Sequence, residues 1–443
     1  MAGRAGALND DKFRLELLCA ALARRRRLLS AAAAAAASSM PSGQGPQGAK
    51  PKPHWQSFSW GAHVGRLTES QFKLRYRLTV DGFYRLVDMM RPDLEVKDEA
   101  RARLAKWGEM VEVETKLAMA LRFLAGGDVL DLQLIYDVSK GYVYNCLWRV
   151  VDSINKHMKV SFPLHDQSKL LRLEAEFRAA SRSQVWSGQV GAVDGVHFPM
   201  QAPTLKDVKD PLKYYVARKG EYAILCMAVC DAARRFTFWD MSQIPTTHDS
   251  LAWAASKLGR AVAAGKLPQP FFMNGDSAFA LSPSMIVPSG FHDVFDFEQS
   301  SNRMPIECAF GILIQRFAVL YRPLRVDFER RAPLIAACMH LHNFCITERI
   351  ADESVDVNGI TMVQPNRWAK TPIFDRDGAP TDHLDIERGE PERRITTSNA
   401  RTVTRDRLIA AIEDAGLERP GVLPPHMNRR KKRGKKRKAQ SRA

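Results

Sequence analysis

The sequence predicts an α/β fold, in which an all-α region precedes one domain of strands and helices. Two observations support this prediction. Up to about residue 165 the apolar residues recur at helical spacing, and from Val185 they form runs of strand length that then alternate with helices. The chain has 443 residues, of which 45% are hydrophobic and 26% charged. This composition is typical of a globular protein that buries a core, and the length favours two or three domains.

Changes in composition divide the sequence into four regions. Residues 1–55 combine an arginine cluster, an alanine run and a Ser/Gly/Pro/Gln stretch, a composition that predicts disorder. Residues 56–165 form the predicted helical domain and residues 185–347 the predicted α/β domain. Residues 348–443 are mostly polar, with one helix expected over 405–415 and a basic tail.

The helical region shows standard start and stop signals. The first predicted helix follows Thr79, a residue type common at N-caps, and stops at Pro92. The next helices are expected over 117–124, 130–137 and 142–158, with Gly126 and Gly127 after the first of them and a break at 139–141.

The last two of these helices have the layout of a helix-turn-helix unit, two helices joined by a short turn that contains glycine. In the second helix Val143, Leu147, Val150 and Ile154 form one apolar stripe, which leaves Tyr142, Asn145, Arg149 and Lys156 on the other side. Arg149 and Lys156 are therefore candidate DNA contacts. An ordinary helical hairpin has the same pattern, and the spacing alone favours the hairpin.

The α/β region begins with three predicted strands, over 186–193, 222–229 and 235–241. A helix over 250–264, a strand over 271–274, and helices over 305–317 and 333–347 follow.

Four acidic residues lie where these elements begin or end. Asp194 and Asp276 each follow an apolar strand, Glu307 lies near the start of a helix, and Asp249 lies between a strand and a helix. Acids that share one cleft repel each other, and hard divalent cations with oxygen ligands relieve this repulsion. Two Mg²⁺ ions about 4 Å apart activate the attacking oxygen and stabilise the leaving oxygen of a phosphodiester. Taken singly, each acid is better explained as the cap of a loop or helix.

The charge balance favours a polyanionic partner. The sequence has 66 Lys and Arg against 49 Asp and Glu, a net charge of +17, and residues 428–443 carry ten of the basic residues. The remainder stays basic, which fits nucleic acid, although soluble basic proteins look similar. The basic block is expected to direct nuclear import. Its residues are Arg429, Arg430, Lys431, Lys432, Arg433, Lys435, Lys436, Arg437 and Lys438.

A set of motifs resembles the transposases of the PIF/Harbinger superfamily and the nucleases derived from them. These motifs occur in the family's order across roughly residues 70–350. They are GAVDGVHFPMQAP (191–203), KYYVARKGEYAILCMAVCDAARRF (213–236), HDS (248–250), NGDSAFALSPSMIVP (274–288), RMPIECAFGILIQRFAVL (303–320) and AACMHLHNFC (336–345).

The resemblance implies an RNase H-like fold with a mixed central sheet flanked by helices. It implies that Asp194, Asp276 and Glu307 are the catalytic acids of a DDE site and hold Mg²⁺ or Mn²⁺, with Asp249 as a further metal-associated aspartate. The segment 123–151 is similar to the family's DNA-binding region, which favours the helix-turn-helix over the hairpin. The sequence departs from the family at Val196 and at Ala278-Phe279. These departures are expected to change the shape of the pocket around the acids and do not remove a metal ligand.

Four more basic residues are candidate DNA contacts. Arg218 and Lys219 match a family motif, and Arg303 and Arg316 lie near Glu307. Instead of contacting DNA, Arg303 and Arg316 could pair with the acids or form a solvated charged face. Arg218 and Lys219 could instead have a structural role.

The resulting functional hypothesis is a metal-dependent DNA endonuclease and transposase. It would cleave phosphodiester bonds at transposon ends and transfer the 3′-hydroxyl to target DNA. The alternatives are a domesticated transposase that binds DNA without cleaving it, and a metal-dependent phosphatase. The expected partners are double-stranded DNA, a Myb-like DNA-binding protein and further copies of the chain, with no membrane partner. The expected location is the nucleus.

Overall fold

The computed structural model describes residues 58–95, 111–348, 373–374, 380–381 and 402–419, which belong to one compact unit. The region predicted to be disordered, 1–55, and the basic tail, 428–443, lie outside the described residues. None of the described helices is long and apolar enough to cross a membrane.

Seven helices of the described chain precede the sheet. They are α2 (Trp60–Val64), α3 (Glu69–Tyr76), α4 (Val80–Leu94), α6 (Val113–Leu124), α7 (Val129–Tyr136), α8 (Lys140–His157) and α9 (Gln167–Ala180). Thr79 caps α4 as predicted, because its hydroxyl accepts a hydrogen bond from the Gly82 amide at 3.0 Å. The α7 and α8 pair provides the predicted two-helix unit.

Strands and helices then alternate. The strands are β1 (Gln189–Pro199), β2 (Tyr215–Val216), β3 (Glu221–Cys230), β4 (Phe236–Asp240), β5 (Phe272–Asn274) and β6 (Met285–Ile286), with a separate pair β7 (Ile373–Phe374) and β8 (Pro380–Thr381). The helices are α10 (Asp249–Ala255), α11 (Lys257–Ala263), α12 (Asp293–Arg316), α13 (Phe328–Thr347) and α14 (Val403–Asp414), with short 3₁₀ turns η1 (Pro211–Tyr214) and η2 (Ala318–Tyr321).

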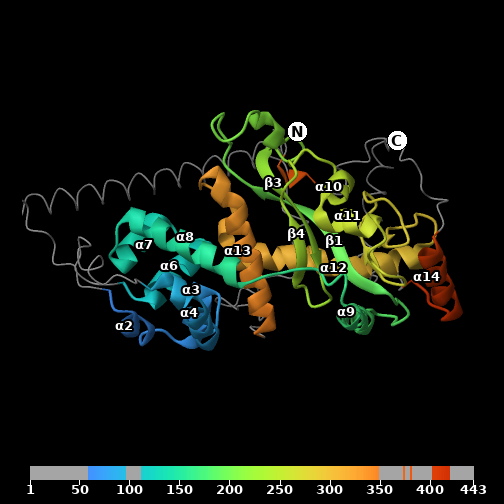
Figure 1. The fold of residues 1–443 in the computed structure, drawn as a ribbon, viewed down its shortest axis with the longest axis horizontal. Coiled ribbons are helices and arrows are strands. Elements are labelled where there is room, and N and C mark those ends of the chain that lie inside the picture. The colour runs from blue at the N-terminus through green and yellow to red at the C-terminus, as the bar shows by residue number, and fades with distance from the viewer. Residues whose placement is uncertain (1–57, 96–110, 349–372, 375–379, 382–401, 420–443) are drawn as a thin grey trace, which may run out of the picture. The chain divides into compact units, whose positions relative to one another are not determined.

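The main sheet is mixed, with β1 at its centre (Figure 1). β1 pairs antiparallel with β3 and parallel with β5, and the sheet continues to β6 on one side and to β2 and β4 on the other. This order confirms the predicted α/β class and is consistent with an RNase H-like fold.

Helices cover both faces of this sheet. On one face Ala192, Phe198 and Cys226 join a large apolar cluster with α12, α13 and the helical region. On the other face Val193 and Met227 pack with apolar residues of α9, α10 and α11. Because side chains alternate between the faces of a strand, each residue of β1 is committed to one of these two layers. The first cluster runs through both predicted domains, whose boundaries stay a prediction.

The turn before α8 differs from the prediction. The break was expected at 139–141, but α8 already begins at Lys140, with Gly141 inside its first turn. Ser139 caps the helix by accepting a hydrogen bond from the Tyr142 amide at 3.2 Å. The left-handed position that ends α7 is Asp137, with φ of 52°, a conformation that aspartate tolerates better than most residues.

Proline was a poor marker of helix ends in this chain. α4 continues past Pro92 to Leu94, α12 begins twelve residues before Pro305, and α13 begins before Pro333. A proline inside a helix removes one backbone hydrogen bond, and the packing of the buried faces of these helices outweighs that loss. α12 instead starts at His292, whose Nδ1 accepts a hydrogen bond from the Phe295 amide at 3.1 Å.

Two further boundaries were wrong. The first strand was expected over 186–193, whereas β1 spans Gln189–Pro199. The helix expected over 250–264 is divided at Ser256, whose buried hydroxyl accepts a hydrogen bond from the Gly259 amide at 2.9 Å. A Cβ at Gly259 would lie 1.9 Å from the Trp253 carbonyl oxygen, so this close approach of α10 to α11 requires glycine.

The buried histidine of α13 generates a prediction about acid stability. His342 is fully buried and its Nε2 donates to the Arg234 carbonyl at 2.8 Å. Burial lowers the pKa of His342 from 6.5 to about 3. The folded state therefore disfavours the charged ring, so this contribution to stability is complete above pH 6.5 and decreases as the pH falls toward 3.

We expect His342→Gln, which keeps a donor near the Nε2 position, to reduce this acid sensitivity. The variant will be less stable than wild type at pH 8. Between pH 6 and 4 its free energy of unfolding will fall less steeply with decreasing pH than that of wild type. The two slopes will differ by about 1.4 kcal/mol per pH unit, because the variant takes up one proton fewer on unfolding. Urea unfolding followed by tryptophan fluorescence at several pH values measures the slope. Equal slopes for the two proteins would contradict the assignment.

Candidate active site

The three predicted catalytic acids come from three different elements. Asp194 lies on β1, Asp276 lies just after β5, and Glu307 lies on α12. Asp194 shares its face of β1 with Ala192 and Phe198, which pack against the apolar face of α12. The charges of Asp276 and Glu307 both act on the Asp194 carboxyl. The structure therefore brings the three acids into one electrostatically coupled cluster.

The sequence suggested that Asp194 follows the end of a strand, but in the structure it does not. It is in the middle of β1, where its backbone pairs with Ala228 of β3. The apolar run stops at Asp194 because the following residues of β1 are only partly buried, not because the strand stops. The ladder on either side of Asp194 fixes its backbone, which suits a side chain that must hold a defined position.

A buried amide network connects the three elements that carry the acids. Gln299 of α12 donates through Nε2 to the Asn274 side chain and to the Gly275 carbonyl, both at 2.6 Å. Gln189 of β1 donates to the Asn302 carbonyl of α12 at 2.9 Å. Gln189, Asn274 and Gln299 are fully buried, so unpaired amides there would be costly and the network specifies one arrangement.

Sequence reasoning missed this network. Its signal was the presence of amide side chains within apolar runs, Gln189 at the start of one strand and Asn274 at the end of another. Such residues are buried only when they are hydrogen-bonded, so they mark polar contacts between elements.

The turn that carries Asp276 is tightly packed. Its Oδ1 accepts a hydrogen bond from the Ala278 amide at 2.8 Å. A Cβ at Gly275 would lie 2.8 Å from the Phe279 ring, which is itself buried against Trp253 of α10. The two residues that depart from the family pattern, Ala278 and Phe279, therefore shape the loop behind Asp276 and leave its second carboxylate oxygen outside this turn.

Arg303 lies between two of the acids. Its Nη1 donates to Asp194 Oδ2 at 3.3 Å, and its other terminal nitrogen pairs with Glu307 Oε1 one helical turn further along α12. Of the roles proposed for Arg303, pairing with the acids is the one seen in the structure. Its role in DNA binding stays a prediction.

The environment of Asp194 favours its protonated form near neutrality. Burial is the main cause and raises the pKa of Asp194 to about 7, with a further contribution from the charges of Asp276 and Glu307. Arg303 and the Gly195 amide oppose this shift. Asp194 thus becomes fully ionised only above neutral pH, or when additional positive charge is bound nearby.

Asp249 lies apart from the other three acids. Its carboxylate is against Gly195, where a Cβ would be 2.9 Å from Oδ1 and 3.1 Å from the sulfur of Met227. Gly195 and Met227 face the α10 side of the sheet, whereas Asp194 faces α12. Asp249 acts electrostatically on His197 and Lys219. The structure therefore does not bring Asp249 to the same face of β1 as Asp194.

The donor atoms fit a hard divalent cation in kind, since Asp194, Asp276 and Glu307 all supply carboxylate oxygens. Their present geometry is not closed around an ion. Within the described residues no three carboxylate, imidazole or thiolate groups stand at the separations that a bound metal requires. Arg303 supplies the local positive charge instead.

The predicted DNA contacts of α8 form intramolecular contacts. Arg149 donates to the Asp93 carbonyl at 2.7 Å, and the exposed Lys156 donates to the Asp93 carboxylate at 2.6 Å. His157 contacts the same carboxylate at 2.6 Å. These bonds fix the end of α8 against α4, and the role of Arg149 and Lys156 in DNA binding stays a prediction.

The other predicted DNA contacts lie at two places. Arg218 and Lys219 are exposed in the turn between β2 and β3. Arg316 is the last residue of α12, and its carbonyl accepts a hydrogen bond from Arg77 Nε at 3.1 Å. The basic residues of the import block lie outside the described residues.

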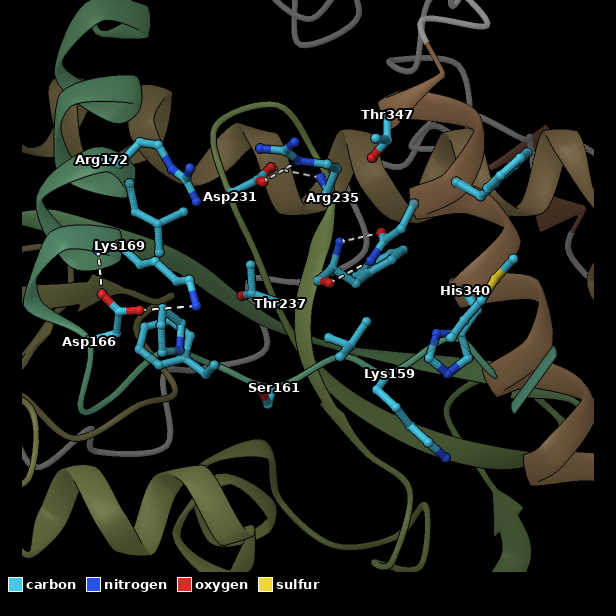
Figure 2. A pocket seen from close by; sticks show the side chains of 18 of the residues that line it. Lys159, Ser161, Asp166, Lys169, Arg172, Asp231, Arg235, Thr237, His340 and Thr347 are labelled. Carbon is cyan, nitrogen blue, oxygen red and sulfur yellow. Dashed lines mark hydrogen bonds and ion pairs between the residues drawn. The ribbon is translucent and has the colours of Figure 1, made fainter. Parts of the chain in front are cut away.

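A groove of about 730 Å³, whose lining does not include the three predicted acids, lies between the start of α9, β4 and α13 (Figure 2). Its charged groups are largely paired with each other, Asp231 with Arg235 at 2.7 Å and Asp166 with Lys169 at 3.0 Å. Asp231 is thus held in an ion pair at the end of β3. No pattern in the sequence indicated this groove, because its walls come from segments far apart in the chain.

Comparisons with known proteins relate the part of the chain that carries the acids to a described family. Residues 193–343 match the family described as DDE superfamily endonuclease. The chain is 24% identical over 316 residues to the Bos taurus protein named "Putative nuclease HARBI1", which covers 67% of this chain and 86% of that protein. The Homo sapiens protein of that name is 24% identical over 322 residues (68% and 86%), and that of Xenopus laevis is 23% identical over 330 residues (68% and 87%).

No solved structure matches the chain at a significant level. The family match spans all three acids and the elements that carry them, except for the first residues of β1. Residues 193–343 are therefore a DDE superfamily endonuclease domain by their family match, and the chain shows distant homology, at 24% identity, to the proteins named "Putative nuclease HARBI1".

Proposed function

We propose that this protein is a metal-dependent DNA endonuclease that acts as a transposase. It cleaves phosphodiester bonds at transposon ends and transfers the freed 3′-hydroxyl to target DNA. The observation that carries the proposal is that Arg303 contacts both Asp194 of β1 and Glu307 of α12, while the charge of Asp276, just after β5, also acts on Asp194. The family match supports an endonuclease, and the net charge of +17 suits a DNA substrate.

In the proposed mechanism Asp194, Asp276 and Glu307 hold Mg²⁺ or Mn²⁺. A divalent cation bound there supplies the positive charge that stabilises the attacking and leaving oxygens of a phosphodiester. The β1 ladder and the amide network keep the carboxylates in position, so little reorganisation is needed when DNA arrives. Asp249, on the other face of β1, acts on this reaction indirectly in our proposal.

We further propose that the protein works on double-stranded DNA in the nucleus, as a homo-oligomer with a Myb-like DNA-binding partner. Two copies are needed to bring two transposon ends together. The α7 and α8 unit, Arg218 and Lys219 supply phosphate contacts that position the DNA. These proposals rest on the family resemblance and on the basic charge of the chain.

Neutralising one catalytic acid should abolish cleavage without unfolding the protein. We expect Asp194→Asn, Asp276→Asn and Glu307→Gln each to reduce Mg²⁺- or Mn²⁺-dependent nicking of the transposon ends by more than roughly a hundredfold, since even outer partners of metal ligands cost 10–100-fold when changed. Double variants will be little worse than single ones, because the acids act as a unit. DNA binding should persist.

The matched control is Asp88→Asn, which removes the same charge from an exposed acid on α4. It should cut at the wild-type rate. If Asp194→Asn cuts as well as this control, the acid cluster is not the catalytic site. If wild type is inert with its own ends and its partner present, the chain is a domesticated DNA-binding protein.

The DNA-binding role of α8 can be tested through its salt dependence. We expect Arg149→Ala with Lys156→Ala to weaken DNA binding and to lower the slope of log K against log salt by about 0.9 for each phosphate that the protein no longer neutralises. Fluorescence anisotropy at several salt concentrations measures this slope.

Because both residues also bind Asp93, the double variant needs a control that weakens the same interaction without removing a fixed charge. His157→Gln serves, since His157 shares the Asp93 carboxylate. It should lower stability somewhat and leave the salt slope unchanged. An unchanged slope in the double variant would mean that α8 is only part of a helical hairpin.

The basic tail should direct nuclear import. A fluorescent fusion of the full chain is expected in nuclei, and deletion of residues 428–443, which removes ten basic residues, should shift it to the cytoplasm. Microscopy of the two fusions measures the ratio of nuclear to cytoplasmic fluorescence. If the truncated fusion stays nuclear, the signal lies elsewhere, and the cluster Arg24–Arg27 becomes the candidate.

A further inference from the structure

Arg303 occupies a position that the cleavage reaction by itself does not explain. Its guanidinium contacts Asp194 from β1 and Glu307 from its own helix, and its side chain is only 17% exposed. An arginine that served only to contact DNA would point toward solvent. Arg303 instead directs its donors at two of the three carboxylates that are proposed to hold metal.

The backbone of Arg303 is firmly placed. The preceding residue, Asn302, accepts a hydrogen bond through its carbonyl from Gln189 of β1 at 2.9 Å, and its side chain donates to the Glu298 carbonyl at 2.9 Å. On the same helix Ile306 is fully buried in the core. This stretch of α12 is therefore fixed against β1, whereas the long side chain of Arg303 can change its partners without moving the helix.

The charges explain why a cation is needed at this point. Asp194, Asp276 and Glu307 together carry three negative charges when ionised, and the burial of Asp194 makes the repulsion that acts on its carboxylate stronger than it would be in water. Arg303 is a cation that contacts two of them. A guanidinium keeps its charge at all relevant pH values, so it relieves this repulsion only by staying in place and ceases to do so only by moving away.

We propose that Arg303 is an internal counter-cation of the acid cluster, and that it competes with the divalent cation for the oxygens of Asp194 and Glu307. Metal binding then requires the guanidinium to leave these oxygens. This inference rests on the proposed metal-dependent function. It explains why the acids are gathered while their geometry, within the described part of the chain, is not closed around an ion.

Competition between Arg303 and the metal ion predicts a different change in metal affinity from the other possible roles of Arg303. If Arg303 competes with the metal ion, removing its charge strengthens metal binding. If it merely orients Asp194 and Glu307 for the metal ion, removing it weakens metal binding. If it only contacts DNA, metal affinity in the absence of DNA does not change.

The test is a titration of the full-length protein with Mn²⁺ alone, by calorimetry at pH 8.5. We expect Arg303→Gln to bind Mn²⁺ about tenfold more tightly, because an opposite charge at contact distance changes the cation affinity of a carboxylate by roughly one to three powers of ten. Arg303→Lys keeps the charge and should bind close to wild type. Arg66→Gln, at an exposed arginine of the helical region, controls for net charge and should not differ.

Thermal unfolding with and without Mn²⁺ is a second measurement on the same proteins. Without the metal, Arg303→Gln should melt at a lower temperature than wild type, because the acids repel. Saturating Mn²⁺ should raise its melting temperature by more than it raises that of wild type. In the background of Asp276→Asn the effect of Mn²⁺ should vanish, whereas the lower melting temperature without metal should only become smaller, because Asp194 and Glu307 are still present.

The outcomes separate the two proposals. If wild type binds Mn²⁺ in a manner that Asp276→Asn abolishes, and Arg303→Gln binds equally or more weakly, competition is wrong while the metal site stands. If no Mn²⁺ binds to wild type or to Arg303→Gln, the metal site and the inference both fall.

Discussion

Strand β1 forms hydrogen bonds along both of its edges, with β3 antiparallel on one side and β5 parallel on the other. This double pairing fixes which side chains of β1 face α12 and which face α10, because a shift by one residue would exchange the two faces. Ala192 and Phe198 must enter one core and Val193 the other, so the register is not free to slip. The direction of Asp194 follows from this constraint.

The acid cluster exists because several buried contacts together overcome repulsion between like charges. The ladder holds Asp194, the turn at Gly275 holds Asp276, and the amides of Gln189 and Gln299 tie α12 to both strands. These three sets of contacts do not use the carboxylate oxygens that face Arg303, so those oxygens remain available to a cation. Arg303 is the cation that the oxygens of Asp194 and Glu307 bind in this structure.

The helical region and the sheet share one apolar cluster, which bears on the proposed binding of DNA. α8 packs against α13, and α13 packs on the sheet. In addition, Arg77 of the helical region donates to the carbonyl of Arg316 at the end of α12. Within residues 58–348, apart from the gap at 96–110, the two-helix unit is thus attached to the helix that carries Glu307 through packed elements. DNA held by α8 would be presented at a defined position relative to the acids.

The sequence by itself determined the class of the fold and predicted which acids form the catalytic site. The change of apolar period at Val185 predicted the switch from helices to sheet, the caps at Thr79 and near Gly126 predicted helix ends, and the motifs around Asp194, Asp276 and Glu307 identified the endonuclease domain. These features are local, because the apolar period, the helix caps and the spacing within motifs depend on residues that are near each other in the sequence.

Only the tertiary structure decided the rest. It extended α4, α12 and α13 past their prolines, since burial of a whole helix face outweighs one missing hydrogen bond. It placed Asp249 on the opposite face of β1 from Asp194, because side-chain parity depends on register. It joined Gln189, Asn274 and Gln299, and set Arg303 between two acids, through contacts between residues 25 to 113 positions apart in the chain. Such contacts leave no periodic trace in a sequence, because they depend on which surfaces meet once the core has formed.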